Sequence, residues 1–238
     1  MRLWHWKDKD MFYGKMKAVT FSYDDGVAQD KRLLDIFNRY GLKGTFNLNS
    51  GKLNEDYYAP DGEVRYKIRP HEIKNVYQGH EVAVHTVTHT NLTTLDTEDI
   101  IREVEQDRIA LEDIVGYPVV GMAYPCGGVN NDDRVAEVLR NDTKVRYGRT
   151  TTSTFCFEPQ ENLYRFNPTV KHTEWEQLER LTEEFLIAQP DKPLLFYIWG
   201  HSYEFDFDDS WARFEAVCRE LAHRDDVFYG TNRQVFRL

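Results

Sequence analysis

The chain has 238 residues, of which 41% are hydrophobic and 29% charged, a composition typical of a soluble globular protein. Its formal net charge of −10 argues against nucleic acid and anionic membrane surfaces as partners. No apolar run approaches the roughly 20 residues of a membrane span, and the first residues lack the apolar segment of a signal peptide. Three cysteines form no disulfide framework, so these features together predict a cytoplasmic protein.

Segments with strand and helix character alternate along the first part of the chain. A run rich in β-formers at residues 17–24 is followed at 28–41 by helical spacing of Leu33, Leu34 and Phe37. The next expected elements are a strand at 44–49, a short helix at 70–78, a strand at 81–87, a helix at 96–115, a strand at 119–125 and a helix at 132–141. The helix at 96–115 is expected to begin at an aspartate cap.

The alternation continues to the end of the chain. The expected elements are strands at 144–151 and 163–170, a helix at 173–189, an apolar strand at 193–201, a helix at 210–223 and a closing strand at 227–231. Strands that alternate with helices indicate a parallel sheet. Six to eight such units favour a barrel over an open sheet, so we predict an α/β fold, a parallel (β/α) barrel, in a single domain over residues 1–238.

Chemically reactive side chains stand at the ends of four predicted strands. Active sites of parallel barrels collect at the C-terminal ends of the strands, so we expect these side chains to meet at one mouth. They are the adjacent Asp24 and Asp25, the pair His85 and His89, the segment "YPCGG" at 124–128, and His201.

The pair His85 and His89 suggests a metal site. Two neutral imidazoles and one carboxylate leave coordination positions open on a divalent cation, as a catalytic zinc or iron(II) requires. With Asp25 as the carboxylate, Asp24 would be free to accept a proton as a general base. The competing interpretations are two histidines with ordinary hydrogen bonds and, for "YDDG", a plain turn.

His201 follows a strand apolar enough to be buried on both faces. A histidine at that position can act as a general acid that protonates a leaving nitrogen or oxygen, and the alternative is a hydrogen-bonded histidine at the rim. Trp199 would wall a small apolar pocket or belong to the core. The charged run "EFDFDD" at 204–209 is expected to be a solvated loop.

These segments resemble the motifs of the polysaccharide deacetylase family, also called the NodB homology domain or carbohydrate esterase family 4. "TFSYDDG" at 20–26 resembles its "TFDDG" motif, and "HTVTH" at 85–89 resembles its "H(S/T)xxH" motif. "AYPCG" at 123–127 resembles the third motif, and "WGH" at 199–201 resembles the end of the fifth. The resemblance spans residues 17–202.

The resemblance implies a role for each matched residue. Asp24 would be the catalytic base, Asp25, His85 and His89 the metal ligands, and His201 the general acid. It also implies a distorted, TIM-like parallel (β/α) barrel of about seven strands. The expected cofactor is one divalent cation, with zinc as the first choice and other transition metals as alternatives.

The third motif departs from the family pattern. The family's arginine, which supports the catalytic base, falls on Ala123. Arg149 and Arg165 are both candidates to replace this cation, and sequence spacing does not decide between them. We find no convincing fourth motif.

The pocket residues depart as well. The tyrosine whose backbone N–H helps to hold the oxyanion falls on Cys126, and the leucine that shapes the acetate pocket falls on Trp199. Tyr124, Cys126 and Trp199 are therefore the expected oxyanion and substrate-pocket residues. A backbone donor survives the change to cysteine.

The function predicted from the sequence is a metal-dependent hydrolase that removes acetyl groups from N-acetylated or O-acetylated carbohydrates. Its enzyme class is a hydrolase of non-peptide carbon–nitrogen bonds. One alternative acts on a different such bond, an amide or ureide of a small molecule. The other is a sugar-binding protein with a decayed site. The expected partner is an acetylated sugar or small-molecule substrate, with short soluble sugars preferred, and the sequence carries no signal for an oligomeric state.

Overall fold

The computed structural model describes residues 11–58 and 62–238. Its strands are β1 Lys17–Asp24, β2 Gly44–Leu48, β3 Tyr57–Tyr58, β4 Val64–Arg65, β5 Glu81–Val84, β6 Gly121–Ala123, β7 Tyr147–Arg149, β8 Val170–Lys171, β9 Leu194–Gly200 and β10 Val227–Tyr229. A curved parallel sheet runs in the order β7-β6-β5-β2-β1-β9-β8, and β10 pairs with β1. The strands β3 and β4 form a separate antiparallel hairpin.

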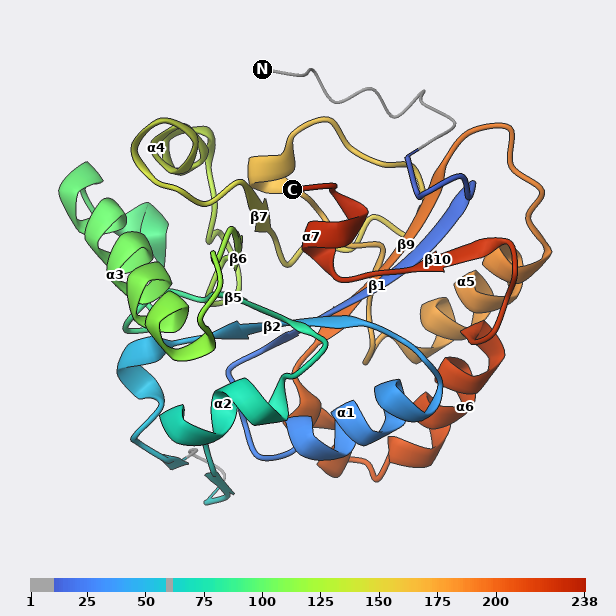
Figure 1. Ribbon diagram of the computed structural model, residues 1–238, viewed down its shortest axis with the longest axis horizontal. Helices are drawn as coiled ribbons and strands as arrows, with labels where there is room; N and C mark the ends of the chain where they lie inside the picture. The colour runs from blue at the N-terminus through green and yellow to red at the C-terminus, as the bar shows by residue number, and fades with distance from the viewer. Residues whose placement is uncertain (1–10, 59–61) are drawn as a thin grey trace.

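The helices are α1 Asp30–Arg39, α2 Pro70–Val76, α3 Thr97–Val115, α4 Asp133–Asp142, α5 Trp175–Ile187, α6 Trp211–Leu221 and α7 Asn232–Val235. All of these helices except α7 lie around the outside of the parallel sheet, and α7 lies near its middle in this view (Figure 1). Four short 3₁₀ helices complete the described elements: η1 Ser50–Lys52, η2 Leu92–Thr94, η3 Leu163–Arg165 and η4 Ser202–Asp206. A single parallel bridge between Arg149 of β7 and Phe166, in the segment before β8, links the two ends of the strand order, so the predicted (β/α) barrel is confirmed in its distorted form.

The sequence explains well why α3 forms. The Asp96 side chain accepts a hydrogen bond from the Asp99 backbone N–H at 2.9 Å, which caps the first turn. Ile100 and Leu111 are buried on the face that packs against the sheet. The helix ends at Gly116, whose φ of 79° is a left-handed conformation that glycine adopts without steric cost.

The prediction of a strand at 163–170 is wrong over most of its length. Residues 163–165 form η3, and only Val170 and Lys171 belong to a strand. Pro168 has no backbone N–H to donate to a strand ladder, which explains the interruption. At the C-terminus, the predicted strand at 227–231 ends at Tyr229, because the Thr231 side chain caps α7.

The strand β1 has the central position that places the site. All eight of its residues are buried, and it pairs in parallel with β2, β9 and β10. In this register Asp24 is opposite Asn47 of β2, and Tyr23 is opposite Gly200 of β9. The end of β1 therefore lies at the middle of the C-terminal mouth. Among the described residues, no helix is both long and apolar enough to cross a membrane.

Candidate active site

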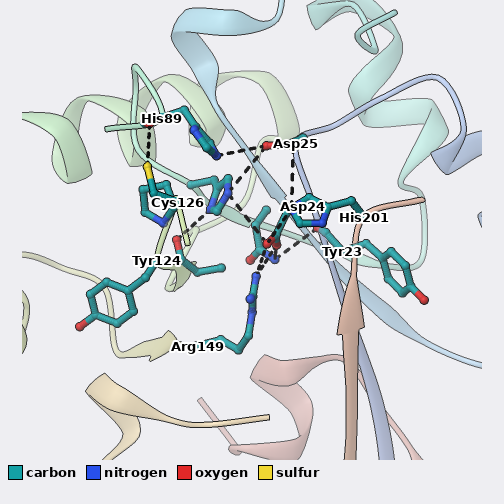
Figure 2. A network of polar contacts seen from close by, with 12 residues as sticks. Tyr23, Asp24, Asp25, His89, Tyr124, Cys126, Arg149 and His201 are labelled. Atoms are coloured by element: carbon teal, nitrogen blue, oxygen red, sulfur yellow. Dashed lines mark hydrogen bonds and ion pairs between the residues drawn. The ribbon is translucent and has the colours of Figure 1, made fainter. Parts of the chain in front are cut away.

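The structure brings together side chains from distant parts of the chain at the mouth of the sheet (Figure 2). Asp24 ends β1 and Asp25 follows it, while His85 directly follows β5. His201 directly follows β9, as predicted from the strand pattern. The expectation that these segments meet at one mouth is thus met by the geometry.

Asp25, His85 and His89 form the one group of potential metal ligands found among the described residues. One ligand atom from each side chain lies within 4.8 Å of the other two. The Nε2 atoms of His85 and His89 lie 3.8 Å and 3.5 Å from the same atom, Asp25 Oδ1. Two imidazole nitrogens and one carboxylate oxygen directed to a common point are a donor set that suits zinc and related transition metals.

The orientation of His85 is fixed by the backbone. Its Nδ1 lies 2.9 Å from the Ala123 carbonyl oxygen, which can only accept, so Nδ1 carries the proton and Nε2 faces Asp25. Burial lowers the pKa of His85 to about 4, against the opposing charges of Asp24 and Asp25. The imidazole is therefore neutral near pH 7, which is the form that binds metal.

Four residues of the site have a left-handed backbone, which non-glycine residues rarely adopt. Their φ angles are 79° at Asp25, 65° at Thr86, 60° at His89 and 67° at Cys126. Such conformations cost roughly 1–3 kcal/mol each and concentrate at functional sites. Those at Thr86 and His89 let the chain turn back after β5, so that the His89 ring lies beside the ring of His85.

Asp24 is held by groups other than the metal ligands. The Arg149 guanidinium of β7 donates from Nη2 to both carboxylate oxygens of Asp24, and Asn47 Nδ2 donates to Oδ1 at 2.8 Å. Burial acts to raise the pKa of Asp24, but the charge of Arg149, followed by those of His85 and His201, lowers it overall. Asp24 is therefore ionised and has a fixed orientation.

Arg149, and not Arg165, occupies the place of the missing cation. Arg165 instead donates to Asp133 Oδ1 at 2.6 Å and to Asn131 Oδ1 at 2.8 Å, on the outer side of η3. The guanidinium of Arg149 also lies 4.5 Å from the ring centroid of Trp199. The tryptophan, which is only 5% exposed, thus forms a cation–π contact with Arg149.

His201 is oriented by Glu204, a residue that the sequence did not reveal. Glu204 Oε2 lies 3.2 Å from His201 Nδ1 and accepts from the His201 backbone N–H at 3.0 Å. The other oxygen accepts from Lys171 at 2.5 Å. Because a carboxylate only accepts, Nδ1 carries a proton and Nε2 faces the aspartates, 3.9 Å from Asp24 Oδ2 and 4.0 Å from Asp25 Oδ2.

The surroundings of His201 favour its protonated form. Burial lowers the pKa of this histidine, but the hydrogen bond to Glu204 and the charges of Asp25, Glu204 and Asp24 raise it overall. The interpretation of residues 204–209 as a solvated loop is therefore wrong at its first two residues, since Phe205 of η4 is fully buried in the core. Glu204 is half-buried against a histidine, while Asp208 and Asp209 are exposed.

The expected oxyanion and pocket residues separate into two groups. Cys126 lies beside the ligands, with its Sγ 3.5 Å from the His89 carbonyl oxygen, and no described residue accepts a hydrogen bond from its backbone N–H. The side chain of Tyr124 does not line the site. It is buried, points away from the aspartates, and donates to the Tyr164 carbonyl oxygen at 2.6 Å (Figure 2).

A pocket of about 330 Å³ opens beside Asp25 and His89. Its walls include Lys52 of η1 and Lys67, whose Nζ donates to the Asp25 carbonyl oxygen at 2.6 Å. Burial lowers the pKa of Lys67, the charges of Asp25 and Asp30 oppose this, and the charge of Lys52 adds to the lowering. The two ammonium groups are thus close enough to repel each other.

Sequence reasoning missed Asn47 and Glu204 and left Arg149 undecided. Asn47 could have been found from the register, since the residue opposite the end of β1 in the neighbouring parallel strand contacts the same mouth. Glu204 has the spacing of a helical i, i+3 pair with His201, a signal hidden because no helix was expected after β9. Nothing in the local sequence distinguishes Arg149 from Arg165.

Comparison with known proteins gives a family match. A family model described as polysaccharide deacetylase matches residues 13–144. A chitin deacetylase of Pestalotiopsis sp is 32% identical over 114 residues, which are 48% of this chain and 35% of that protein. The peptidoglycan-N-acetylglucosamine deacetylase PgdA of Listeria monocytogenes serotype 1/2a (strain 10403S) is 26% identical over 125 residues, 52% of this chain and 24% of that protein. The matches therefore span less than half the length of these relatives.

The similarity of the fold extends over nearly the whole chain. A solved structure of a T48 deacetylase with substrate superposes with a TM-score of 0.59 and 17% sequence identity. The superposition covers 93% of this chain and 92% of that one. It includes the part after residue 144 that contributes Arg149, His201 and Glu204, where the family model does not reach.

Proposed function

The chain belongs to the polysaccharide deacetylase family, and on that premise we propose that it hydrolyses the acetyl group of an N-acetylated or O-acetylated carbohydrate. The observation that carries the proposal is the meeting of Asp24 and His201, 3.9 Å apart, beside a cluster of metal-ligating side chains. Opposite pKa shifts keep the first ionised and favour the protonated form of the second. A base and an acid prepared at the same pH are what the hydrolysis of an amide or ester requires.

The cofactor in this proposal is one divalent cation, with zinc as the expected ion. Asp25, His85 and His89 would hold it, and their donor atoms fit such an ion. When bound, the cation would supply Lewis acidity toward the acetyl carbonyl and the attacking water. His85 and His89 contribute neutral nitrogens, and the fixed tautomer of His85 keeps its Nε2 available.

Asp24 acts as the general base in the proposed reaction. Its carboxylate accepts the proton of a water molecule as the water oxygen forms a bond with the acetyl carbon. Arg149 and Asn47 do not touch the substrate; they hold the carboxylate in one orientation. The fixed orientation contributes to the rate, because catalytic groups act efficiently only within a narrow range of geometries.

His201 acts as the general acid. As the bond from the acetyl carbon to the sugar nitrogen or oxygen breaks, His201 Nε2 donates its proton to that leaving atom. Glu204 stabilises the protonated ring before the transfer, through its hydrogen bond to Nδ1. The Cys126 backbone N–H is free to donate to the oxyanion that develops on the carbonyl oxygen.

Three further parts of the proposal concern the domain, the cellular compartment and the size of the substrate. We propose that residues 1–238 act as one catalytic domain in the cytoplasm on short, soluble acetylated sugars. Support comes from Cys126, Cys156 and Cys218, which are all free thiols as expected in a reducing compartment. Cell fractionation and a comparison of turnover on a disaccharide with turnover on insoluble polymer test these parts.

Acetate release from a panel of acetylated mono- and oligosaccharides, with and without added zinc, tests the central proposal. The wild-type protein should release acetate from at least one N-acetylated or O-acetylated sugar, and chelation should abolish the release. Asp24→Asn should keep the fold and the bound metal yet lose activity by roughly two to four orders of magnitude, the usual size of a general-base contribution.

Two results would contradict this proposal. Hydrolysis of amides or ureides of small molecules without any acetylated sugar would move the activity to another carbon–nitrogen bond. Loss of metal in Asp24→Asn would mean that Asp24 is a ligand and that the roles of the two aspartates are exchanged.

A further inference from the structure

The pocket beside the candidate metal site contains two lysines without ion-pair partners. Within the described part of the chain, no carboxylate oxygen lies within 4.0 Å of Lys52 Nζ or Lys67 Nζ. This is unusual for a protein with a net charge of −10. Two unpaired ammonium groups that repel each other in one pocket are stabilised by an anion placed between them.

The backbone holds Lys67 firmly in this position. Lys67 forms an antiparallel bridge with Val27, and the Ile68 backbone N–H donates to the Gly26 carbonyl oxygen at 2.8 Å. The Lys67 Nζ donates one hydrogen bond, to the Asp25 carbonyl oxygen, so two of its three N–H donors are left for a ligand. Lys52 is the last residue of η1, which begins shortly after β2 ends, and it lines the same pocket as Lys67.

The described acidic residues around the pocket form no ion pair with these lysines, although the charges of Asp25 and Asp30 act on Lys67. Asp25 belongs to the ligand group, and both oxygens of Asp56 accept from Arg69 at 2.8 Å. Glu55, the remaining acid in the pocket wall, is exposed to solvent. With Asp56 paired to Arg69 and Asp25 committed to a bound cation, Glu55 would be the one remaining described acid in the pocket wall opposite the two lysines, which leaves a positive surplus next to the site where the acetyl group would react.

Aromatic rings complete the pocket wall. Tyr57 and Tyr203 both line it, and the guanidinium of Arg65 lies 4.3 Å from the Tyr203 ring centroid and 5.4 Å from that of Tyr57. The two tyrosines, with Arg65 over their rings, give the wall apolar surface that suits the C–H groups of a sugar ring, whereas the lysine ammonium groups suit an anion. Together they suit a ligand that combines a sugar ring with a negative charge.

We propose that this pocket, with Lys52 and Lys67, binds an anionic substituent of the sugar, a carboxylate or a phosphate, while the acetyl group lies at Asp24 and His201. The substrate class is then an acetylated sugar acid or sugar phosphate. The inference rests on the proposed deacetylase function, since it names the substrate of the same site. It assigns to Lys52 a role in specificity, without a part in bond breaking.

The experiment compares three acetylated sugars that differ in charge. N-acetylglucosamine is neutral, N-acetylmuramic acid adds a carboxylate, and N-acetylglucosamine 6-phosphate adds a phosphate. The wild-type KM for at least one anionic sugar should be about tenfold lower than for the neutral one, the size expected of one charge-assisted hydrogen bond. The preferred anion identifies the substituent. In Lys52→Met the ratio of the neutral KM to the anionic KM should fall to about one.

Lys192→Met is the matched control. It removes the same charge from an exposed lysine that precedes β9, at the opposite end of the strands from the site, and it should keep both activity and preference. Equal KM values for all three sugars in the wild-type protein would overturn the inference. An anion preference that persists in Lys52→Met would also overturn it, because Lys52 would then have no role in specificity.

A binding measurement separates this inference from the deacetylase proposal. Titration calorimetry measures the Kd values of glucosamine, glucosamine 6-phosphate and muramic acid. None of these sugars carries an acetyl group, so the measurement does not depend on hydrolysis. One possible result is that no acetylated sugar is hydrolysed, while the anionic sugars bind about tenfold more tightly than glucosamine to the wild type but not to Lys52→Met. That result would support the anion pocket and refute the deacetylase function. Equal Kd values for charged and neutral sugars refute the pocket, whatever the activity.

Discussion

Replacing Arg149 with methionine should impair both folding and catalysis. Arg149 is fully buried and donates to both oxygens of Asp24, which is itself only 1% exposed. In Arg149→Met the Asp24 carboxylate keeps the Asn47 amide, at 2.8 Å, as a side-chain donor. Breaking a buried ion pair by removal of one partner costs about 3–5 kcal/mol. For a chain of this size each kcal/mol lowers Tm by roughly 2–4 °C, so Tm should fall by about 10 °C.

The effect on activity has a signature that a loss of stability alone does not produce. Because Arg149 lowers the pKa of Asp24, its removal raises that pKa, and the base becomes protonated at a higher pH. The acidic limb of the kcat/KM profile should therefore move to higher pH. At the optimum, kcat/KM should fall about 100-fold, the effect of a displaced catalytic group. Thermal unfolding by circular dichroism, metal content and the pH profile are measured on the same preparation.

Two further variants make the test specific to Arg149. Arg165→Met removes the other candidate cation, which is paired with Asp133 on the surface, and should change stability by less than about 1 kcal/mol. Arg149→Lys keeps the charge but loses the guanidinium that donates to both Asp24 oxygens, so it should be more active than Arg149→Met and less active than the wild type. Wild-type activity and an unmoved acidic limb in Arg149→Met would refute the reasoning, as would an equal loss in Arg165→Met.

Three shorter predictions concern the metal, the fold and the acid. Elemental analysis should find bound zinc lost in His85→Ala and kept in the exposed control His71→Ala; full metal content in His85→Ala would exclude it as a ligand. Burial raises the pKa of Asp30 from 3.8 to about 7. The stability that depends on neutral Asp30 is therefore fully present below about pH 4 and is lost as the pH rises through 7. Urea unfolding should show stability falling by up to about 1.4 kcal/mol per pH unit in that window, and a smaller slope in Asp30→Asn; equal slopes would contradict the assignment. In Glu204→Gln the pKa of His201 should fall, and the alkaline limb of kcat/KM should move to lower pH; an unmoved limb would remove Glu204 from the mechanism.

The first half of the fold could be predicted because its signals are local. In β1 and α3, strand composition, helical spacing, an aspartate cap and a terminal glycine lie within a few residues of what they determine. The segment from 144 to 170 has weaker signals. Its strands β7 and β8 have three and two residues, so their pairing depends on contacts with β6 and β9 and not on their own periodicity.

In the candidate site, too, some residues have local sequence signals and others depend on contacts between distant segments. Asp25, His85 and His89 lie in short segments whose residue types and spacing suggest a group of metal ligands, and the structure brings their donor atoms together. Arg149 and Glu204 carry no such spacing, because their role depends on which side chain the fold places opposite them. A prediction from sequence therefore identifies candidate ligands and proton-transfer groups more readily than the groups that orient them.

The pairing of β1 with β9 and β10 also bears on when the candidate site can form during synthesis. Lys17, at the start of β1, pairs with Leu194 and with Val227, so the central strand leaves the ribosome long before two of its neighbours. Pairing between such distant segments is slow, because the closure of a long loop precedes the gain from the contacts. The mouth assembles only when the last quarter of the chain has joined the sheet. The proposed chemistry therefore needs β9, and a released fragment that ends before this strand has the candidate ligands but lacks His201, the proposed acid.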